Sequence, residues 1–227
     1  MTRTDSPSGA ECRAPSAESR CTGVILAGGG ATRYGGLPKG LERVRGRRVI
    51  DRVADALREA ADELLLIAND PEAGSWLPGI RVERDVRPGL GSLGGIHSAL
   101  VHARSAALVV AWDMPFVPAP LLASLRAAGE REGRAMVPES GSRRGVEPLC
   151  AYYTQALVAP IERCLDAGDL RVIAFYDDRL VGRLAATEVA RFGDPAQLFM
   201  NVNTPSELEL AEHHAATTDG GDRREEA

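Results

Sequence analysis

Short apolar runs alternate with helical patterns through the first half of the chain and beyond. Continuous apolar runs that end in glycine or a polar residue are typical of strands buried on both faces of a sheet, whereas apolar residues that recur every three or four positions indicate helices. The runs predict strands at 24–26, 64–68, 80–82 and 107–112, and the recurring patterns predict helices at 49–61, near 93–103 and from 118 onward. The alternation predicts an α/β fold in which helices cover both faces of a mainly parallel sheet.

The later part of the chain is less regular. Residues 135–137 and 149–153 flank a polar turn, and we expect them to pair as strands. A further apolar run at 198–200 is interpreted as a short strand. The sequence NTPSE at 203–207 then has the Thr-x-x-Glu spacing of a capping box, with proline at the first helical position, and it predicts a C-terminal helix to about residue 214.

The two ends of the chain differ from its middle. Residues 1–20 are rich in serine, proline, arginine and glutamate and lack the apolar core of a secretory signal, and the residues from 215 onward are also polar. We therefore expect disordered extensions at 1–21 and 215–227 around one folded domain at 22–214. A chain of 227 residues is long enough for one such domain with a sizeable core.

Composition argues against several classes of function. The formal net charge is −5, and an acidic chain is a poor candidate for binding nucleic acid or an anionic membrane surface. No apolar run approaches the roughly 20 residues of a membrane span. The four cysteines lack CxxC spacing and zinc-ligand spacing to histidine, which favours free thiols in a reducing compartment. We expect a cytoplasmic protein whose partners include neither nucleic acid nor membrane.

The first predicted strand runs directly into a glycine-rich loop, LAGGGATRYGGLPKG at 26–40. Glycines let backbone N–H groups approach a polyphosphate closely, and Arg33 and Lys39 would supply positive charge. A dinucleotide fingerprint requires a third glycine where Arg33 stands, which disfavours a dehydrogenase. A P-loop requires a glycine before the lysine and Ser or Thr after it, and Lys39 has neither. The loop therefore predicts a phosphate site of a third type.

Two rare residue types also gather at predicted sites. Lys39 is the only lysine, and the other 26 of the 27 basic residues are arginine. A compact ammonium kept where arginine is otherwise used is what a phosphate-binding lysine would look like. All three asparagines, Asn69, Asn201 and Asn203, follow predicted strands, where ligands bind in parallel sheets. A ligand role is favoured for Asn201, whereas for Asn203 a helix-start turn is an equal alternative.

Two carboxylates occupy comparable positions. Asp113 follows the predicted strand at 107–112 and could hold Mg²⁺, a hard ion that prefers oxygen ligands and bridges phosphates; the alternative is a turn aspartate. Asp85 follows the strand at 80–82, and its alternative is a surface salt bridge. The glycine-rich stretch at 89–95 then opens a helix, and its small residues would let a base or ribose pack against the backbone.

Taken together, these residues resemble the molybdenum cofactor guanylyltransferase family. Its pattern is an LAGG loop with a downstream Arg and GG-x-x-K, an Asp before a G-x-L-x-G segment, a CDxP-type metal site and a terminal NVNTPEEL. In this chain the pattern reads Leu26-Ala27-Gly28-Gly29, Arg33, Gly35-Gly36 and Lys39, then Asp85, residues 91–95, Asp113-Met114-Pro115, and NVNTPSEL at 201–208. The match runs in order through nearly all of residues 22–212.

The resemblance implies a Rossmann-like nucleotidyltransferase fold, a three-layer sandwich of the glycosyltransferase-A-like type. It implies transfer of GMP from GTP to the terminal phosphate of molybdopterin or Mo-molybdopterin, with release of pyrophosphate. It implies Mg²⁺ as the cofactor, with Mn²⁺ as an alternative ion. Transient contacts with molybdenum-insertion proteins or molybdoenzyme chaperones would follow from the same role.

The family's functional residues carry over position by position. Lys39 and Arg33 would hold the triphosphate and the departing pyrophosphate, and Asp113 would ligate the metal, so these three are the expected catalytic residues. Further nucleotide contacts are expected at Leu26, Ala27, Gly28, Gly29, Asp85 and Gly94, and Asn201 and Asn203 would line the pterin side. The chain departs from the pattern at Trp112, Ser92 and Ile67, and Trp112 could reshape the pocket.

Three alternatives remain open. A cytidylyltransferase acting on the same pterin would keep the chemistry, but such enzymes typically begin LAAG and end DIDTP, unlike this chain. A sugar-phosphate or isoprenoid nucleotidylyltransferase is disfavoured by the C-terminal pattern. A non-catalytic nucleotide-binding regulatory module is disfavoured because Lys39, Arg33 and Asp113 are retained together.

Overall fold

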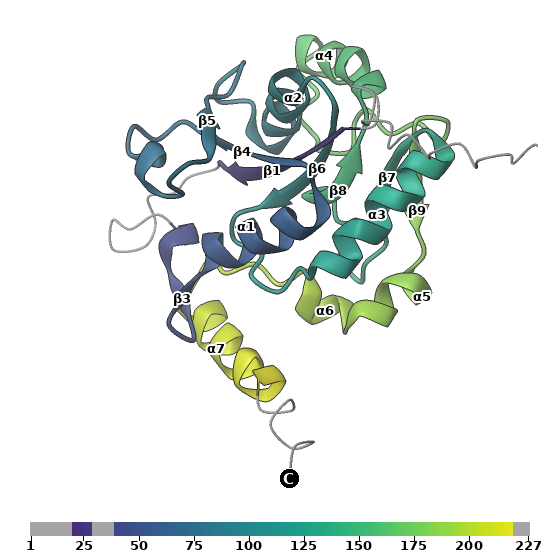
Figure 1. The fold of residues 1–227 in the computed structure, drawn as a ribbon. Coiled ribbons are helices and arrows are strands. Elements are labelled where there is room, and N and C mark those ends of the chain that lie inside the picture. The colour runs from purple at the N-terminus through teal and green to yellow at the C-terminus, as the bar shows by residue number, and fades with distance from the viewer. Residues whose placement is uncertain (1–19, 29–38, 220–227) are drawn as a thin grey trace, which may run out of the picture.

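The computed structural model describes residues 20–28 and 39–219, which form a seven-stranded sheet between two layers of helices (Figure 1). The strand order is β5-β4-β1-β6-β8-β7-β9. Only β8 runs antiparallel to its neighbours among these strands, so the expected mainly parallel sheet is confirmed. The strands are β1 (Cys21–Ala27), β4 (Glu63–Ala68), β5 (Arg81–Glu83), β6 (Ala106–Ala111), β7 (Ala135–Pro138), β8 (Cys150–Tyr153) and β9 (Val181–Leu184).

The central strand β1 fixes where the functional edge of the sheet lies. Its apolar run is fully buried and pairs in parallel with β4 on one side and β6 on the other. In this register Ala27 lies opposite Ala68, and Leu26 lies opposite Ala111. The carboxyl ends of the three strands therefore meet at one edge of the sheet, and the residues that follow them lie together there.

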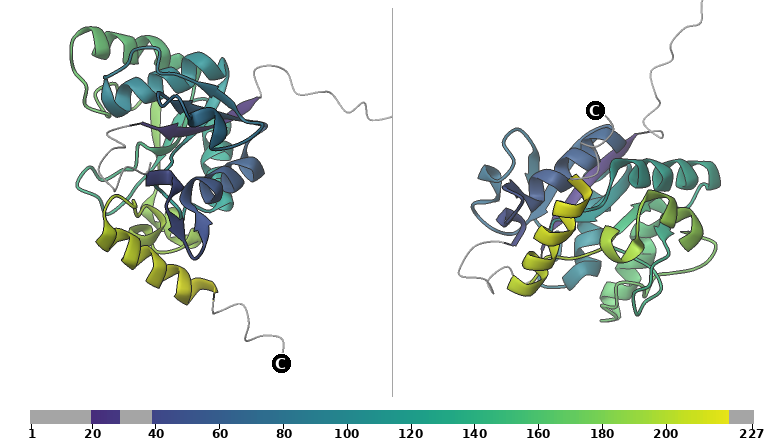
Figure 2. Two further views of the ribbon diagram at one scale, coloured as in Figure 1. Left: turned by 90° about the vertical axis from the view of Figure 1, so that its left-hand side faces the viewer. Right: turned by 90° about the horizontal axis from the view of Figure 1, so that it is seen from below.

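Helices cover both faces of the sheet, as Figures 1 and 2 show. Alternate residues of β1 point to opposite faces: Ile25 packs into a core with α1 (Val49–Ala60) and α3 (Ala119–Glu132). Val24 packs into a second core with α2 (Gly91–Ala103) and α4 (Val158–Asp166). Burial of each large aliphatic side chain in these cores contributes about 1.5–3 kcal/mol, which holds the sheet edge as a rigid platform.

The expected pair of later strands is also confirmed. β7 and β8 run antiparallel, with Met136 opposite Tyr152. Other elements were not predicted from the sequence. These are the hairpin of β2 (Arg43–Val44) and β3 (Arg47–Arg48), the helices α4, α5 (Ala186–Val189) and α6 (Pro195–Leu198), the edge strand β9, and the short 3₁₀ turns η2 (Lys39–Leu41), η3 (Ala73–Ser75), η4 (Gln155–Leu157) and η5 (Ala190–Phe192).

The prediction of a strand at 198–200 was wrong. The side chain of Asp194 accepts a hydrogen bond from the N–H of Ala196 at 2.9 Å, and Pro195 occupies the first helical position, so a capped helical turn precedes this run. Leu198 ends α6, and Phe199 packs into the core next to α1 and α3. The following asparagines therefore come after a helix rather than a strand.

The capping box correctly predicted where the C-terminal helix begins. In α7 (Pro205–Asp219), Oγ1 of Thr204 accepts from the N–H of Glu207 at 3.2 Å. The helix continues to Asp219, past the expected end at residue 214, because Ala211 and Ala215 extend its buried face against Val44 and Val49. It lies outside the two helical layers, beside the β2–β3 hairpin (Figure 2).

The helix α7 includes residues 215–219, which the sequence prediction placed in a disordered tail, and the boundary predictions otherwise stay predictions. Residues 1–19 and 220–227 lie outside the described part of the chain, and β1 begins at Cys21. In the part that is described, no helix is both long enough and apolar enough to cross a membrane.

Candidate nucleotide site at the sheet edge

A cavity of about 670 Å³ opens at the edge of the sheet where β1, β4 and β6 end. Its volume is within the range of small-molecule sites. The ends of β1 and β4 contribute backbone and apolar walls, and the glycine-rich start of α2 contributes another wall. Of the predicted site residues, the cavity brings together Leu26, Ala27, Gly28, Lys39, Asp85, Asp113 and Asn203.

The other predicted site residues are not among the described lining residues of this cavity. Gly29 and Arg33 fall outside the described residues. Gly94 faces Leu90, since a Cβ added at Gly94 would lie 2.9 Å from the Leu90 Cβ, and its neighbour Gly95 lines the cavity instead. Asn201 is half-buried and is not among the described residues that line the cavity.

The start of α2 presents polar backbone to the cavity. Gly91 and Ser92 are lining residues, and the residue before the helix, Leu90, makes no side-chain cap to it. The first N–H groups of a helix have no partner within the helix, and the helix dipole places partial positive charge at this end. Gly91 has φ +63°, so a side chain there would be strained. This wall therefore suits close approach of a polar or anionic ligand.

Asp85 is held in place by an asparagine from the neighbouring strand end. The Asn69 side-chain N–H donates to Oδ2 of Asp85 at 2.7 Å, and the backbone N–H of Asp85 donates to Oδ1 of Asn69 at 3.0 Å. Within the described part of the chain, this reciprocal pair and not a salt bridge holds the Asp85 carboxylate. Asn69, to which the sequence assigned no role, thus orients the Asp85 carboxylate at the cavity wall.

Asp113 occupies the turn directly after β6 and Trp112. Its backbone carbonyl accepts from the N–H of Val202 at 2.9 Å, which ties this turn to the segment before α7. Burial raises the pKa of the Asp113 carboxyl; its own backbone N–H and Lys39 oppose that rise, and Glu207 adds to it. A carboxylate that is half-buried and incompletely compensated in charge gains from a bound cation.

The donor set at this edge fits a cation held jointly with a ligand. Among the described residues, no group of three or more His, Cys, Asp or Glu side chains could hold a metal ion. Mg²⁺ is commonly bound through one or two carboxylates together with substrate phosphates and water. Asp113 therefore fits an ion whose remaining ligands come from a nucleotide.

Lys39 reaches the cavity from the short turn η2. Its Nζ donates to Oδ1 of Asn203 at 2.6 Å, a contact between residues far apart in sequence. A Cβ added at Gly40 would lie 2.4 Å from Cε3 of Trp112, so the turn rests directly on the indole. Trp112 is only 2% exposed and stacks on Trp76 with ring centroids 5.2 Å apart. Trp112 therefore packs inward and supports the residue next to Lys39, and it is also one of the residues that line the cavity.

Known proteins are similar to this chain in sequence. Residues 23–181 match the family of MobA-like NTP transferase domains. The molybdenum cofactor guanylyltransferase of Desulfosudis oleivorans is 34% identical over 193 residues, covering 84% of this chain and 94% of that protein. The molybdenum cofactor guanylyltransferase of Cereibacter sphaeroides is 36% identical over 197 residues, covering 85% of this chain and 96% of that protein.

A solved structure has the same fold. The molybdopterin-guanine dinucleotide biosynthesis protein A from Archaeoglobus fulgidus superimposes with a TM-score of 0.73 at 27% identity. The match covers 86% of this chain and 99% of that one.

Proposed function

Because the chain belongs to the family of MobA-like NTP transferases, we propose that it transfers GMP from GTP to the terminal phosphate of molybdopterin or Mo-molybdopterin and releases pyrophosphate. Membership confirms the family resemblance and the Rossmann-like α/β fold that were predicted from the sequence. The choice of guanine and of the pterin is supported by the names of relatives that match over most of their length.

The observation that carries the proposal is one cavity with three kinds of group at its wall. Lys39 supplies a cation, Asp113 supplies a metal-binding carboxylate, and Asp85 with Asn69 supplies fixed polar atoms for a nucleoside. A nucleoside triphosphate needs all three kinds. Leu26, Ala27 and Gly28 offer backbone at the end of β1, and Gly95, which lines the cavity, is proposed as a nucleotide contact in place of Gly94.

The chemistry requires positioning and charge neutralisation more than a general base. The attacking group is a phosphate that is already ionised at neutral pH, so it must be aligned with the departing pyrophosphate. The Lys39 ammonium would offset charge that develops at the α-phosphate and the leaving group. Asp113 would hold Mg²⁺, or Mn²⁺ in its place, and the bound ion would neutralise further phosphate charge. Arg33 is proposed for the same triphosphate from outside the described residues.

The acceptor lies on the side of the cavity formed by the segment before α7. Asn203 lines the cavity and already contacts Lys39, so it is proposed to meet the pterin phosphate beside the triphosphate. Asn201 is proposed to reach the pterin farther from the cavity. Transient docking of molybdenum-insertion or molybdoenzyme chaperone proteins would deliver and remove the cofactor. The free thiols of Cys21, Cys150 and Cys164 fit a cytoplasmic location for this exchange.

Pyrophosphate release tests the proposal. The protein is incubated with molybdopterin, Mg²⁺ and one of GTP, CTP, ATP or UTP. Release with GTP alone supports guanylyl transfer, and release with CTP alone would replace it by cytidylyl transfer. Release with none of the four, together with a Tm that GTP raises only when Mg²⁺ is present, would favour the non-catalytic binding module.

A further inference from the structure

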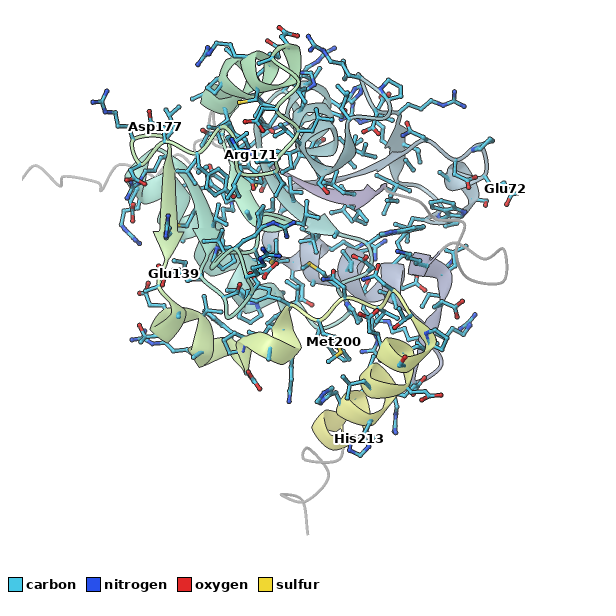
Figure 3. All side chains as sticks on the ribbon, turned by 180° about the vertical axis from the view of Figure 1, so that it is seen from behind. Glu72, Glu139, Arg171, Asp177, Met200 and His213 are labelled. Atoms are coloured by element: carbon cyan, nitrogen blue, oxygen red, sulfur yellow. The ribbon has the colours of Figure 1, made fainter. Side chains whose placement is uncertain are left out.

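The segment from Asn201 to Glu207 connects two of the proposed catalytic residues, Lys39 and Asp113, to the C-terminal helix. The N–H of Val202 donates to the carbonyl of Asp113 at 2.9 Å, and Oδ1 of Asn203 accepts from Lys39 at 2.6 Å. Figure 3 labels Met200 just before this segment, between α6 and α7. A single short stretch of chain thus contacts the metal-binding turn and the phosphate-binding lysine.

Glu207 fixes this stretch from the first turn of α7. Its Oε2 accepts from the backbone N–H of Asn203 at 2.7 Å, while its own N–H donates to Thr204. In an ordinary capping box the glutamate reaches the N–H of the capping residue itself. Here the carboxylate reaches one residue farther back, to the residue whose side chain holds Lys39.

The helix that carries Glu207 is itself anchored. Ala211 and Ala215 of α7 are buried against Val44 and Val49, which belong to the hairpin and to the start of α1. The backbone N–H of Arg45 also donates to Oε1 of Glu212 at 2.8 Å. The restraint on Lys39 therefore runs from the packed helix through Glu207 and Asn203 to the ammonium.

We propose that Glu207 is a positioning residue: by fixing the backbone of Asn203, it holds the Lys39 ammonium at the cavity wall where the triphosphate binds. Lysine has a flexible four-carbon stem, and its ammonium gains catalytic value only where it is held in place. The catalytic consequence rests on the proposed guanylyl transfer. The geometric consequence does not, because the contacts exist without substrate.

The unique lysine makes the geometric consequence measurable without any activity. An amine-specific reagent labels only Lys39 and the N-terminal amine, so mass spectrometry of the Lys39 peptide reports its reactivity directly. Glu207→Ala is expected to speed Lys39 labelling by about tenfold, because the ammonium loses its fixed acceptor. Glu207→Gln keeps an acceptor for the Asn203 N–H and is expected to restore slow labelling.

Two controls separate positioning from helix capping. Thr204→Ala removes the cap to the Glu207 N–H but leaves the bond between Glu207 and Asn203. Glu209→Ala removes an equal charge from an exposed position of the same helix. Both are expected to label at the wild-type rate, although Thr204→Ala should lower Tm. If Lys39 is labelled fast in Thr204→Ala, the helix cap and not the contact of Glu207 with Asn203 restrains Lys39, which overturns the proposal.

Turnover with GTP and molybdopterin completes the test. Glu207→Ala is expected to lower kcat by about tenfold with KM for GTP changed by less than about twofold, and Glu207→Gln should recover most of kcat. Suppose that the wild type transfers GMP and that Glu207→Ala has the wild-type Lys39 labelling rate and kcat. The positioning role of Glu207 then fails, and the proposed function stands. If the wild type transfers no GMP but the labelling differences appear, the proposed function fails and the restraint on Lys39 stands.

Discussion

Adding one methyl group at Gly40 tests whether the indole of Trp112 holds the turn that carries Lys39 in place. A Cβ there would lie 2.4 Å from Cε3 of Trp112 and 2.7 Å from its Cδ2, whereas ordinary contacts begin at 3.4 Å. The indole is buried and stacked on Trp76, so it has little room to retreat. The turn that carries Lys39 must therefore move by about 1 Å, the difference between the shortest distance and an ordinary contact.

The size of the effect follows from that displacement. A shift of about 1 Å at a positioned group lowers the rate by on the order of a hundredfold, and overpacking of a buried contact costs about 1–3 kcal/mol of stability. We expect Gly40→Ala to lower kcat for GTP-dependent pyrophosphate release by about a hundredfold and to lower Tm. Gly74→Ala is the matched control, because a Cβ at Gly74 would meet nothing within 4 Å. If the Gly40→Ala protein has the same kcat and Tm as the Gly74→Ala protein, contact with Trp112 does not position Lys39, and the reasoning is refuted.

Three further predictions concern the cavity wall. Lys39→Ala and Asp113→Ala should each lower kcat by about a hundredfold or more while the fold stays intact; wild-type turnover of either protein in the pyrophosphate assay would remove that residue from the mechanism. Because burial raises the pKa of Asp113, ionisation costs folding free energy, and Asp113→Asn should raise Tm in metal-free buffer, which thermal unfolding measures; a lowered Tm would contradict the cause assigned to the shift. Asn69→Ala should raise KM for GTP by about tenfold with little change in kcat, because the Asp85 carboxylate loses its orienting partner; an unchanged KM in steady-state kinetics would show that Asp85 does not contact the nucleoside.

Local sequence signals predicted the platform of the site. The apolar runs and the helical periods depend on neighbouring residues, and so does the capping box before α7. The rule that ligands bind beyond the carboxyl ends of parallel strands then placed Asp85 and Asp113 at one edge. The cavity lies at that edge and includes both residues.

Contacts between distant segments could not be predicted in the same way. The bond between Lys39 and Asn203 depends on how α7 docks on the β2–β3 hairpin, and no local pattern encodes that docking. Whether Gly94 or Gly95 faces the cavity depends on the rotation of α2, in which adjacent residues point about 100° apart. The apolar run at 198–200 by itself predicts a strand, whereas the Asp-Pro pair ahead of it is a helix-start signal that agrees with the structure.

Asparagine is rare in this chain, and Asn69 directly follows a strand; together these two facts were a usable signal of a site residue. It is one of three asparagines and follows a buried strand, yet the sequence assigned it no partner. The structure pairs it with Asp85 through two hydrogen bonds. In the parallel register of β4 and β5, Ile67 lies opposite Glu83, so Asn69 and Asp85 each follow two residues later, and this register is not visible in the sequence.

Product identification under direct competition tests the central claim most directly. The protein is incubated with molybdopterin, Mg²⁺ and equal concentrations of GTP and CTP, and the pterin product is identified by mass spectrometry. The account predicts the guanine dinucleotide form as the main product, formed together with pyrophosphate. A cytosine dinucleotide as the main product would contradict the assignment of the base, and unmodified molybdopterin would contradict the transfer itself.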